Sequence, residues 1–396
     1  MLKHIGLNRN LATLSGTIFI NLFVSYLWYP LLPLHLRALG ASDWEIGVSF
    51  TVMGIAHAIF AVFGGALADR YGRRLVTAAP TFLMAPLYIA AGLANNWLIV
   101  IAMLVGTNIL GAVQWPAMSA LITESSDDAR VARAFSFTES GVLIGLIAGP
   151  IAGAALLTTL SISAMIVLYG VVLIFTSGMR AWGLTEPARR TAGSAMPRLR
   201  TAIDPSVRWF IAGGTCIAIA FAISFGPYFA ILARDAWHNG EGEINLLWAA
   251  GSLASLLGIL FGRLSDHWGA RRVLMLSALA YGVSTIAWGI APTWEWGLAP
   301  LLIAFGFSEA VFIAQQTLQA EITSRETRSS MIGIIVTTTG LLGGLGPTLG
   351  AWLITLGGNA APFVAAGLVS LLAILAIWQV RGNVASVAHV VSAQAE

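Results

Sequence analysis

The chain has 396 residues, of which 57% are hydrophobic and only 10% are charged. Soluble domains carry about one quarter charged residues, so this composition excludes a soluble globular protein and predicts one that lies in a lipid bilayer. The formal net charge of +3 does not indicate nucleic-acid binding, because membrane topology already explains basic residues at the ends of membrane-spanning helices.

Twelve apolar runs follow one another along the chain, and each is predicted to cross the bilayer as a helix. Hydrocarbon offers the backbone no hydrogen-bond partners, so only closed secondary structure is stable there. Gly or Pro interrupts several of the runs. In chain order they begin near Leu11, Glu45, Leu75, Trp97, Ala134, Ile162, Val207, Ile244, Val273, Leu298, Ser329 and Ala361.

The basic residues favour one orientation. If the N-terminus is cytoplasmic, all of the 21 Lys and Arg except Arg37 and Arg234 lie on the cytoplasmic side. Cytoplasmic segments carry the excess of basic residues, so the sequence predicts a multi-pass inner (plasma) membrane protein with both termini in the cytoplasm. The first run is too long for a signal peptide, and no cleaved signal is expected. Cys216, the single cysteine, lies in the seventh run and is expected to fill apolar space.

The two halves of the chain match at a constant offset of 197 residues. The matching pairs are Pro30 with Pro227, Arg37 with Arg234, Gly54 with Gly251, Gly65 with Gly262, Asp69 with Asp266, Gly72 with Gly269 and Arg74 with Arg271. A repeat of six helices keeps both copies in the same orientation, so the repeat is parallel. The predicted domains are a six-helix bundle (1–184), a cytoplasmic linker (185–206), a second six-helix bundle (207–381) and a cytoplasmic tail (382–396).

Two copies of one loop carry a family resemblance. They read "GGALADRYGRR" at 64–74 and "GRLSDHWGARR" at 262–272, where His267 replaces the first basic residue of the pattern. With twelve predicted helices in two repeats, the chain resembles the major facilitator superfamily over nearly its whole length. This resemblance implies an all-α integral membrane fold of two parallel six-helix repeats. The residues that match its signature are Gly65, Asp69, Arg70, Gly72, Arg73, Arg74, Gly262, Asp266, Gly269, Arg271 and Arg272.

A gating role is expected for this loop. Asp69 can accept hydrogen bonds from the free N–H groups that open helix 11 near Ser329, where the helix dipole favours an anion. The arginines can pair with acids at cytoplasmic helix ends, Glu124 or Glu321, in contacts between the bundles that break during transport. The alternative is that the arginines only anchor topology.

The fifth run contains a stripe of glycines one helical turn apart, which lets another helix approach closely, and a proline that bends the helix. This stripe is similar to the fifth-helix motif of the drug:proton antiporter branch of the superfamily. Generic close packing is the alternative. The residues are Gly141, Gly145, Gly149, Pro150 and Gly153, and the second copy keeps Gly346, Pro347 and Gly350. Many antiporters of this branch carry an Arg in helix 4, but Thr107 stands there in this chain.

Ionisable residues inside the membrane are functional candidates because they are costly to bury. Glu309 is the acid predicted to lie deepest, in the middle of helix 10, where desolvation disfavours the charged form and makes proton exchange feasible. Glu139 lies nearer the cytoplasmic end of helix 5, and His57 lies in the middle of helix 2. These three are the predicted proton-coupling residues. Ordinary hydrogen bonding or ion pairing is the alternative for each of them.

The resemblance implies that helices 1, 4, 7 and 10 line a central cavity. Polar and aromatic residues of these helices are therefore expected to contact the substrate, and such a lining suits a hydrophobic or cationic compound. The predicted cavity residues are Asn21, Ser25, Trp28, Thr107, Asn108, Gln114, Trp115, Phe312 and Gln316.

The sequence thus predicts a secondary active transporter that exports small amphipathic or cationic compounds by proton-coupled, multidrug-type efflux. A facilitator or importer of a nutrient, metabolite or lipid is one alternative, and a transport-inactive membrane sensor is another. Neither an enzyme nor an ATP-driven pump is expected, because no catalytic constellation or phosphate-binding loop is present. The expected partners are the substrate, protons and the bilayer, without nucleic acid, cofactor or metal, and the expected state is a monomer.

Overall fold

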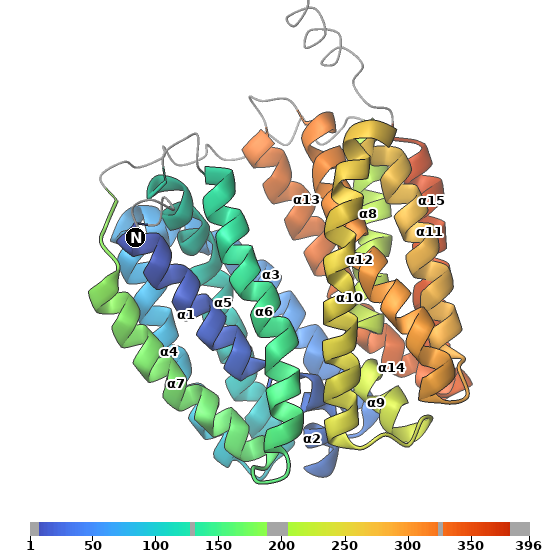
Figure 1. Cartoon of the computed structure of the whole chain (residues 1–396), viewed down its shortest axis with the longest axis horizontal. Coiled ribbons are helices and arrows are strands. Elements are labelled where there is room, and N and C mark those ends of the chain that lie inside the picture. The colour runs from blue at the N-terminus through green and yellow to red at the C-terminus, as the bar shows by residue number, and fades with distance from the viewer. Residues whose placement is uncertain (1–7, 127–130, 188–204, 324–327, 381–396) are drawn as a thin grey trace, which may run out of the picture.

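A computed structural model of the chain describes residues 8–126, 131–187, 205–323 and 328–380. These residues form helices and turns without a strand, which confirms the predicted fold class (Figure 1). Most of the predicted linker (188–204) and the tail (382–396) lie outside the described residues. The helices are α1 (Arg9–Ser25), α2 (Leu32–Ala38), α3 (Asp43–Tyr71), α4 (Arg73–Leu93), α5 (Trp97–Glu124), α6 (Val131–Leu156), α7 (Ile162–Gly183), α8 (Pro205–Ser224), α9 (Tyr228–Asp235), α10 (Glu241–Trp268), α11 (Ala270–Gly289), α12 (Trp294–Ile322), α13 (Arg328–Gly343), α14 (Gly346–Gly357) and α15 (Ala361–Trp378).

Each predicted run corresponds to a helix or a broken helix. Within the described residues, 11 helical spans are long and apolar enough to cross a membrane, and the remaining predicted run is α10, a helix of 28 residues that packs against α6 and α12. Runs 1, 7 and 11 are each broken into two helices, next to Pro30, Pro227 and Pro347. Proline has no N–H to donate to the preceding turn, which explains these breaks.

The repeat is visible in the backbone as well as in the sequence. Gly72 separates α3 from α4 with φ +91°, and Gly269 separates α10 from α11 with φ +81°. Both values fall in the left-handed region, where only glycine is unstrained. The two glycines are 197 residues apart, which is the offset of the repeat, so the duplicated loop makes the same reversal in each half.

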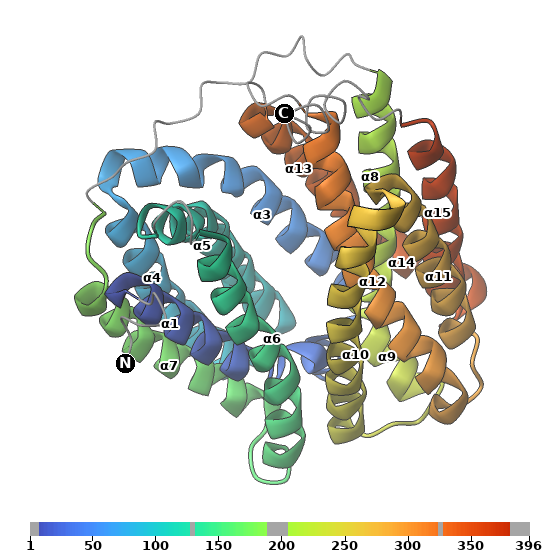
Figure 2. The same ribbon diagram turned by 45° about the horizontal axis from the view of Figure 1, so that its top comes forward.

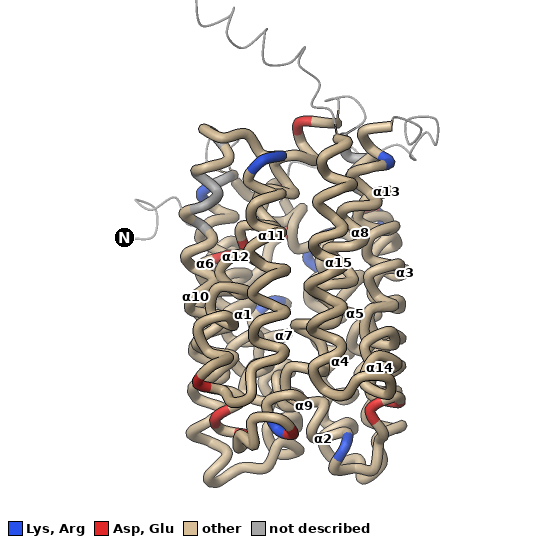
Figure 3. Tube along the Cα trace, turned by 90° about the vertical axis from the view of Figure 1, so that its right-hand side faces the viewer, with Lys and Arg blue, Asp and Glu red and all other residues tan. Residues whose placement is uncertain are grey.

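The two halves, α1–α7 and α8–α15, stand side by side and diverge toward one end (Figures 1 and 2). We call this end, which carries Gly72 and Gly269, the basic end, and the other the closed end. Charged residues gather toward both ends of the bundle, with few between them (Figure 3).

Three polar contacts join the halves at the closed end. Arg37 forms an ion pair with Asp235 at 2.8 Å, Asn245 Nδ2 donates to the backbone carbonyl of Leu27 at 2.9 Å, and Thr348 Oγ1 lies 2.8 Å from Thr51 Oγ1. Arg37 is also held by Asp43 of its own half at 2.6 Å. The external arginine predicted from the repeat is therefore part of the closure between the halves.

The glycine stripe of α6 packs on α1. A Cβ atom added at Gly149 would lie 2.7 Å from the backbone oxygen of Phe23 and 2.8 Å from the Cβ of Tyr26, and one at Gly145 would lie 3.0 Å from the Cβ of Leu22. The predicted close approach is present, and its partner is a helix of the same half. Gly346 plays the equivalent part in the second half, where an added Cβ would lie 2.8 Å from the Cβ of Ala222.

Gly149→Val is therefore expected to destabilise the first half by about 1–3 kcal/mol, because the side chain must push α1 away from α6. Gly16→Val on α1 is the control, since a Cβ there meets nothing within 4 Å. The melting temperature of the purified protein and its leak of protons in liposomes measure the effect. Equal stability and equally tight, coupled transport in both variants would show that the stripe tolerates bulk.

Candidate functional site

A cavity of about 400 Å³ lies within the first half, between α1, α3, α4, α5 and α7. Several residues predicted from the sequence line it, from three helices, α1, α3 and α5. These residues are Asn21, His57, Thr107, Asn108, Gln114 and Trp115. A volume of this size suits a small molecule, and the lining combines apolar and aromatic side chains with a few amides and hydroxyls.

The amides and hydroxyls of the wall are fixed by neighbouring helices. Gln114 on α5 donates from Nε2 to the backbone carbonyl of Thr77 and to Oγ1 of Thr81 on α4, both at 2.6 Å. Asn21 on α1 accepts a hydrogen bond from Thr176 on α7 at 2.8 Å. Hydrogen bonds from α4 and α7 thus fix the amides that α5 and α1 contribute to the wall.

Other predicted cavity residues lie elsewhere. Trp28 is only 1% exposed and packs in an aromatic cluster with Tyr88 and Tyr169, their ring centroids 6.0 and 6.3 Å from its own. It lies in the core of the first half and is not among the residues that line the cavity. Ser25 does not line the cavity either. Phe312 and Gln316 are exposed on α12 in the second half.

Sequence reasoning missed Arg180, which lies on α7 and lines the same cavity. It is 2% exposed, and the structure gives it two hydroxyl partners, Thr17 at 2.9 Å and Thr81 at 2.7 Å. The sequence signal was a single Arg inside an apolar run, three residues before its end. At that position it was counted among the cytoplasmic anchors.

Glu309 lies at the middle of α12, 15 residues from its first residue and 13 from its last. Its Cβ is 2.5 Å from the position that a Cβ on Gly258 would occupy, so α10 and α12 cross closely at this acid. Glu139 on α6, in the other half, is near enough for the two carboxylates to interact electrostatically. The two acids therefore lie close to the junction between the halves, and neither lines the cavity of the first half.

The charged residues of the first signature loop form a network inside the first half. Asp69 pairs with Arg73 at 2.6 Å across the Gly72 turn, and Arg73 pairs with Glu124 at 3.1 Å. Glu186, just after α7, accepts hydrogen bonds from the backbone N–H groups of Arg73 and Arg74 at 2.8 and 3.0 Å. An acid thus caps a helix N-terminus here as expected, but the helix is α4 and the acid is Glu186.

The pairing expected between the bundles is accordingly not seen in this conformation. Glu124 binds Arg73 of its own half, and the ion pair that the described residues give Asp69, whose side chain is 44% exposed, is also with Arg73. The reason is that the halves are apart at the basic end. Glu321 is exposed on α12, and the side chain of Ser329 lies outside the described residues.

The remaining signature residues bind locally. Arg74 donates from Nε to the backbone carbonyl of Ala181 at 3.1 Å, and Arg70 lies over the ring of Tyr71 at 5.3 Å. In the second copy, Arg271 donates to the backbone carbonyl of Val380 at 2.8 Å, and Arg272 is exposed. The side-chain environments of Gly262 and Asp266 lie outside the described residues.

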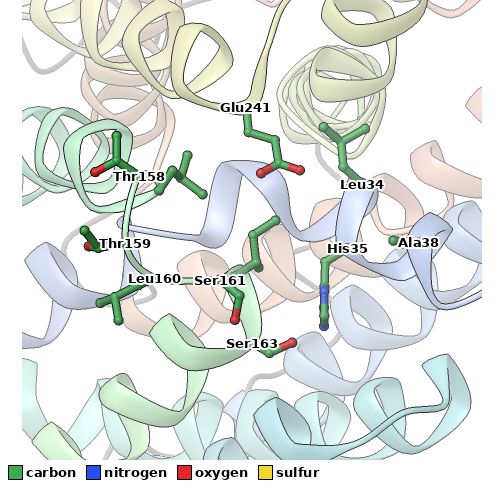
Figure 4. A pocket seen from close by; sticks show the side chains of 11 residues that line it. Leu34, His35, Ala38, Thr158, Thr159, Leu160, Ser161, Ser163 and Glu241 are labelled. Atoms are coloured by element: carbon green, nitrogen blue, oxygen red, sulfur yellow. The ribbon is translucent and has the colours of Figure 1, made fainter.

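A second cavity, of about 450 Å³, lies at the closed end. Figure 4 shows Glu241 entering it from the second half, opposite His35, Ser161 and Ser163 of the first. It is slightly larger than the cavity near Arg180, but none of the residues predicted to contact substrate lines it. The cavity of the first half is therefore the better candidate for a binding site.

Two repeats of membrane-spanning helices, with a cavity within the first of them, define a multi-pass membrane protein. The family model of the Major Facilitator Superfamily matches residues 14–233 and again 210–390, and the chain belongs to this superfamily. The predicted family resemblance is thereby confirmed.

Among its relatives, the chain is 26% identical over 276 residues to the multi-drug resistance efflux pump PmrA of Streptococcus pneumoniae, an alignment that spans 63% of this chain and 65% of the pump. It is 25% identical over 334 residues to the multidrug resistance protein MdtG of Enterobacter lignolyticus, which spans 79% of this chain and 78% of that protein. Among solved structures, a bacterial homologue of the human lysosomal transporter Spinster, inward-facing and occupied, superposes with a TM-score of 0.72 at 16% identity, over 93% of this chain and 94% of that one.

Proposed function

We propose that the protein is a secondary active transporter that exports small amphipathic compounds in exchange for protons. The observation that carries this proposal is the cavity of about 400 Å³ in a bundle whose halves are joined at one end only. The names of two relatives, the multi-drug resistance efflux pump PmrA and the multidrug resistance protein MdtG, support it. The cationic substrates expected from the sequence are not favoured, because no acidic side chain is among the described residues that line this cavity.

The basic end is proposed to face the cytoplasm of a cell with an inner (plasma) membrane, with both termini on that side. In this orientation the structure is an inward-facing conformation, closed toward the outside by Arg37, Asp235 and their neighbours. A substrate dissolved in the cytoplasm or in the inner leaflet reaches the cavity from the basic end. Export then requires the closed end to open and the basic end to close.

Asp69 is proposed to exchange partners during this change, from Arg73 in the present conformation to the start of α13 when the basic end closes. Its half-exposed side chain is free to move, and pairing with Arg73 alone contributes little stability at such exposure. Asp69→Asn is therefore expected to leave the protein folded and to favour the inward-facing conformation. Asp69→Glu, which keeps the carboxylate, is the control.

Labelling of Thr51→Cys from outside, in a Cys216→Ser background, measures this shift. Thr51 is buried at the join of the halves, so a membrane-impermeant maleimide reaches it only when the closed end opens. We expect slower labelling with Asp69→Asn than with the parent. Unchanged labelling together with normal transport would mean that the loop serves only topology.

Purified protein in liposomes with an imposed pH gradient tests the proposed function. Uphill movement of an amphipathic dye that collapses when the gradient is dissipated is the expected result. Downhill movement that ignores the gradient would support the facilitator or importer instead. No movement of a panel of neutral, anionic and cationic dyes, in a protein that is folded, would favour the transport-inactive sensor.

A further inference from the structure

Arg180 lies near a helix end, where arginines anchor helices at the membrane surface, but its side chain points into the protein. Its Cα is three residues before the end of α7, where an arginine ordinarily extends its head group outward to the interface. Its guanidinium instead contacts Thr17 and Thr81, each eight residues from the basic-end start of its helix, Arg9 or Arg73. Eight residues correspond to roughly 12 Å along a helix axis, so the charge points into the protein.

The partners of this guanidinium are neutral. Nε donates to Oγ1 of Thr17 and Nη1 donates to Oγ1 of Thr81, while no carboxylate of the described residues forms an ion pair with Arg180. Both hydroxyls are committed in turn, since Thr17 donates to the carbonyl of Leu14 and Thr81 to that of Thr77. Of the five N–H groups on an arginine, two are used in this way, and three remain.

A buried charge without a counter-charge is costly, and an ionisable residue kept inside a membrane protein is by default a candidate functional residue. Arg180 and His57 are the residues that can bear positive charge among those described in the cavity wall, and the same wall has no Asp or Glu. The planar fork of a guanidinium fits a carboxylate, sulfonate or phosphate through two parallel hydrogen bonds. A cationic compound would meet only repulsion at this point.

The rest of the wall specifies the body of such a compound. Leu22, Met84, Met118 and Leu173 are apolar, and the aromatic ring of Trp115 is 52% exposed beside them. Apolar side chains around one fixed cation are complementary to a hydrophobic molecule that carries a single anionic group. Glu309 and Glu139 lie outside this wall, so a bound anion and an exchanged proton do not compete for one site.

We infer that Arg180 recognises the substrate and that the transported compounds are amphipathic anions. This inference rests on the proposed export function for the meaning of "substrate", but the binding of an anion to Arg180 can be measured without transport. It changes the expected chemistry of the site from attraction of cations by acids to attraction of anions by one buried guanidinium.

Two dyes with the same aromatic skeleton provide the test, the sulfonate 1-anilinonaphthalene-8-sulfonate and the neutral N-phenyl-1-naphthylamine. Binding of each dye is measured by equilibrium dialysis against the full chain in lipid nanodiscs, with empty nanodiscs subtracted. Arg180→Gln is expected to weaken binding of the sulfonate by at least about tenfold, the effect of losing a charge-assisted hydrogen bond. The neutral dye should bind within twofold of the parent, and Arg180→Lys, which keeps the charge but not the fork, should lose less sulfonate affinity than Arg180→Gln.

The matched control is Arg133→Gln, which removes the same charge from an exposed position on α6. It should leave both dyes unaffected. Equal weakening of both dyes by Arg180→Gln, or sulfonate binding that is unchanged in Arg180→Gln, would overturn the inference, as would a parent protein that binds only the neutral dye. If Arg180→Gln does not fold, Arg180→Lys takes its place in the test. An Arg180→Lys protein that prefers the neutral dye would overturn the inference, and one that keeps the sulfonate preference supports it.

Transport is a separate arm of the experiment. Arg180-dependent binding of the sulfonate without gradient-driven movement of either dye would refute the proposed function and leave the anion site established. Gradient-driven movement of the neutral dye or of the cation ethidium, with no Arg180-dependent binding of the sulfonate, would uphold the proposed function and refute the anion site.

Discussion

Glu309→Gln is expected to abolish transport driven by a pH gradient and to leave exchange of substrate across the membrane intact. Glutamine keeps the shape of the side chain and its capacity for hydrogen bonds while fixing a neutral form. Exchange needs only the conformational change, but uphill transport also needs a group that binds and releases a proton in each cycle. Gradient-driven and counterflow assays on the same liposomes separate the two.

The position of Glu309 is the reason for choosing it. It lies at the middle of α12, and none of the ion pairs among the described residues includes it. Glu139 of the first half is near enough for the two carboxylates to interact electrostatically. Any movement of the halves changes this interaction, which links protonation to conformation.

Glu139→Gln is the matched comparison, because it removes the other member of the pair. Glu139 is exposed and lies only eight residues from the start of α6, so we expect this variant to keep uphill transport at a reduced rate. If Glu309→Gln transports uphill at the parent rate and Glu139→Gln does not transport uphill, the proton-coupling acid is Glu139 and the prediction is wrong.

The periodic and repeated features of this fold could be read from the sequence. Hydrophobic length predicted the twelve helical runs, and within the described residues 11 of them are long and apolar enough to cross a membrane. The offset of 197 residues predicted the pair of loops in which Gly72 and Gly269 adopt the same left-handed conformation. The helix breaks beside Pro30, Pro227 and Pro347 follow from the missing N–H of proline.

The partners of charged residues could not be read in the same way. Position along a helix indicated how deep a Cα lies but not where a long side chain ends, so Arg180 was indistinguishable from a cytoplasmic anchor. Thr107 stands where many antiporters of the drug:proton branch, which this chain resembles, carry an arginine. The structure places Thr107 and Arg180 in the wall of one cavity, so a different helix brings a cation to the same space.

Glu124→Ala is expected to destabilise the first half by about 3–5 kcal/mol, because it leaves the guanidinium of Arg73 buried without its closest enclosed partner. The side chains of Arg73 and Glu124 are 5% and 0% exposed and their charged atoms are 3.1 Å apart. Asp69 also pairs with Arg73, but its half-exposed carboxylate is screened by solvent and cannot compensate fully. The melting temperature of the purified protein measures the loss.

Two comparisons decide whether the buried charge of Arg73 causes the loss of stability in Glu124→Ala. Glu241→Ala removes an acid that pairs with Arg234 at 3.8 Å, where both side chains are exposed, and should change the melting temperature little. Replacing Arg73 and Glu124 together by Met should recover most of the stability lost in Glu124→Ala, because no unpaired charge then remains inside. If the double variant is less stable than Glu124→Ala, the pair contributes through its attraction and hydrogen bond rather than by neutralising a buried charge. In that case the ion pair of Arg73 with Glu124 holds the loop at Gly72 in place. This ion pair would then have to break whenever α3 moves against α4.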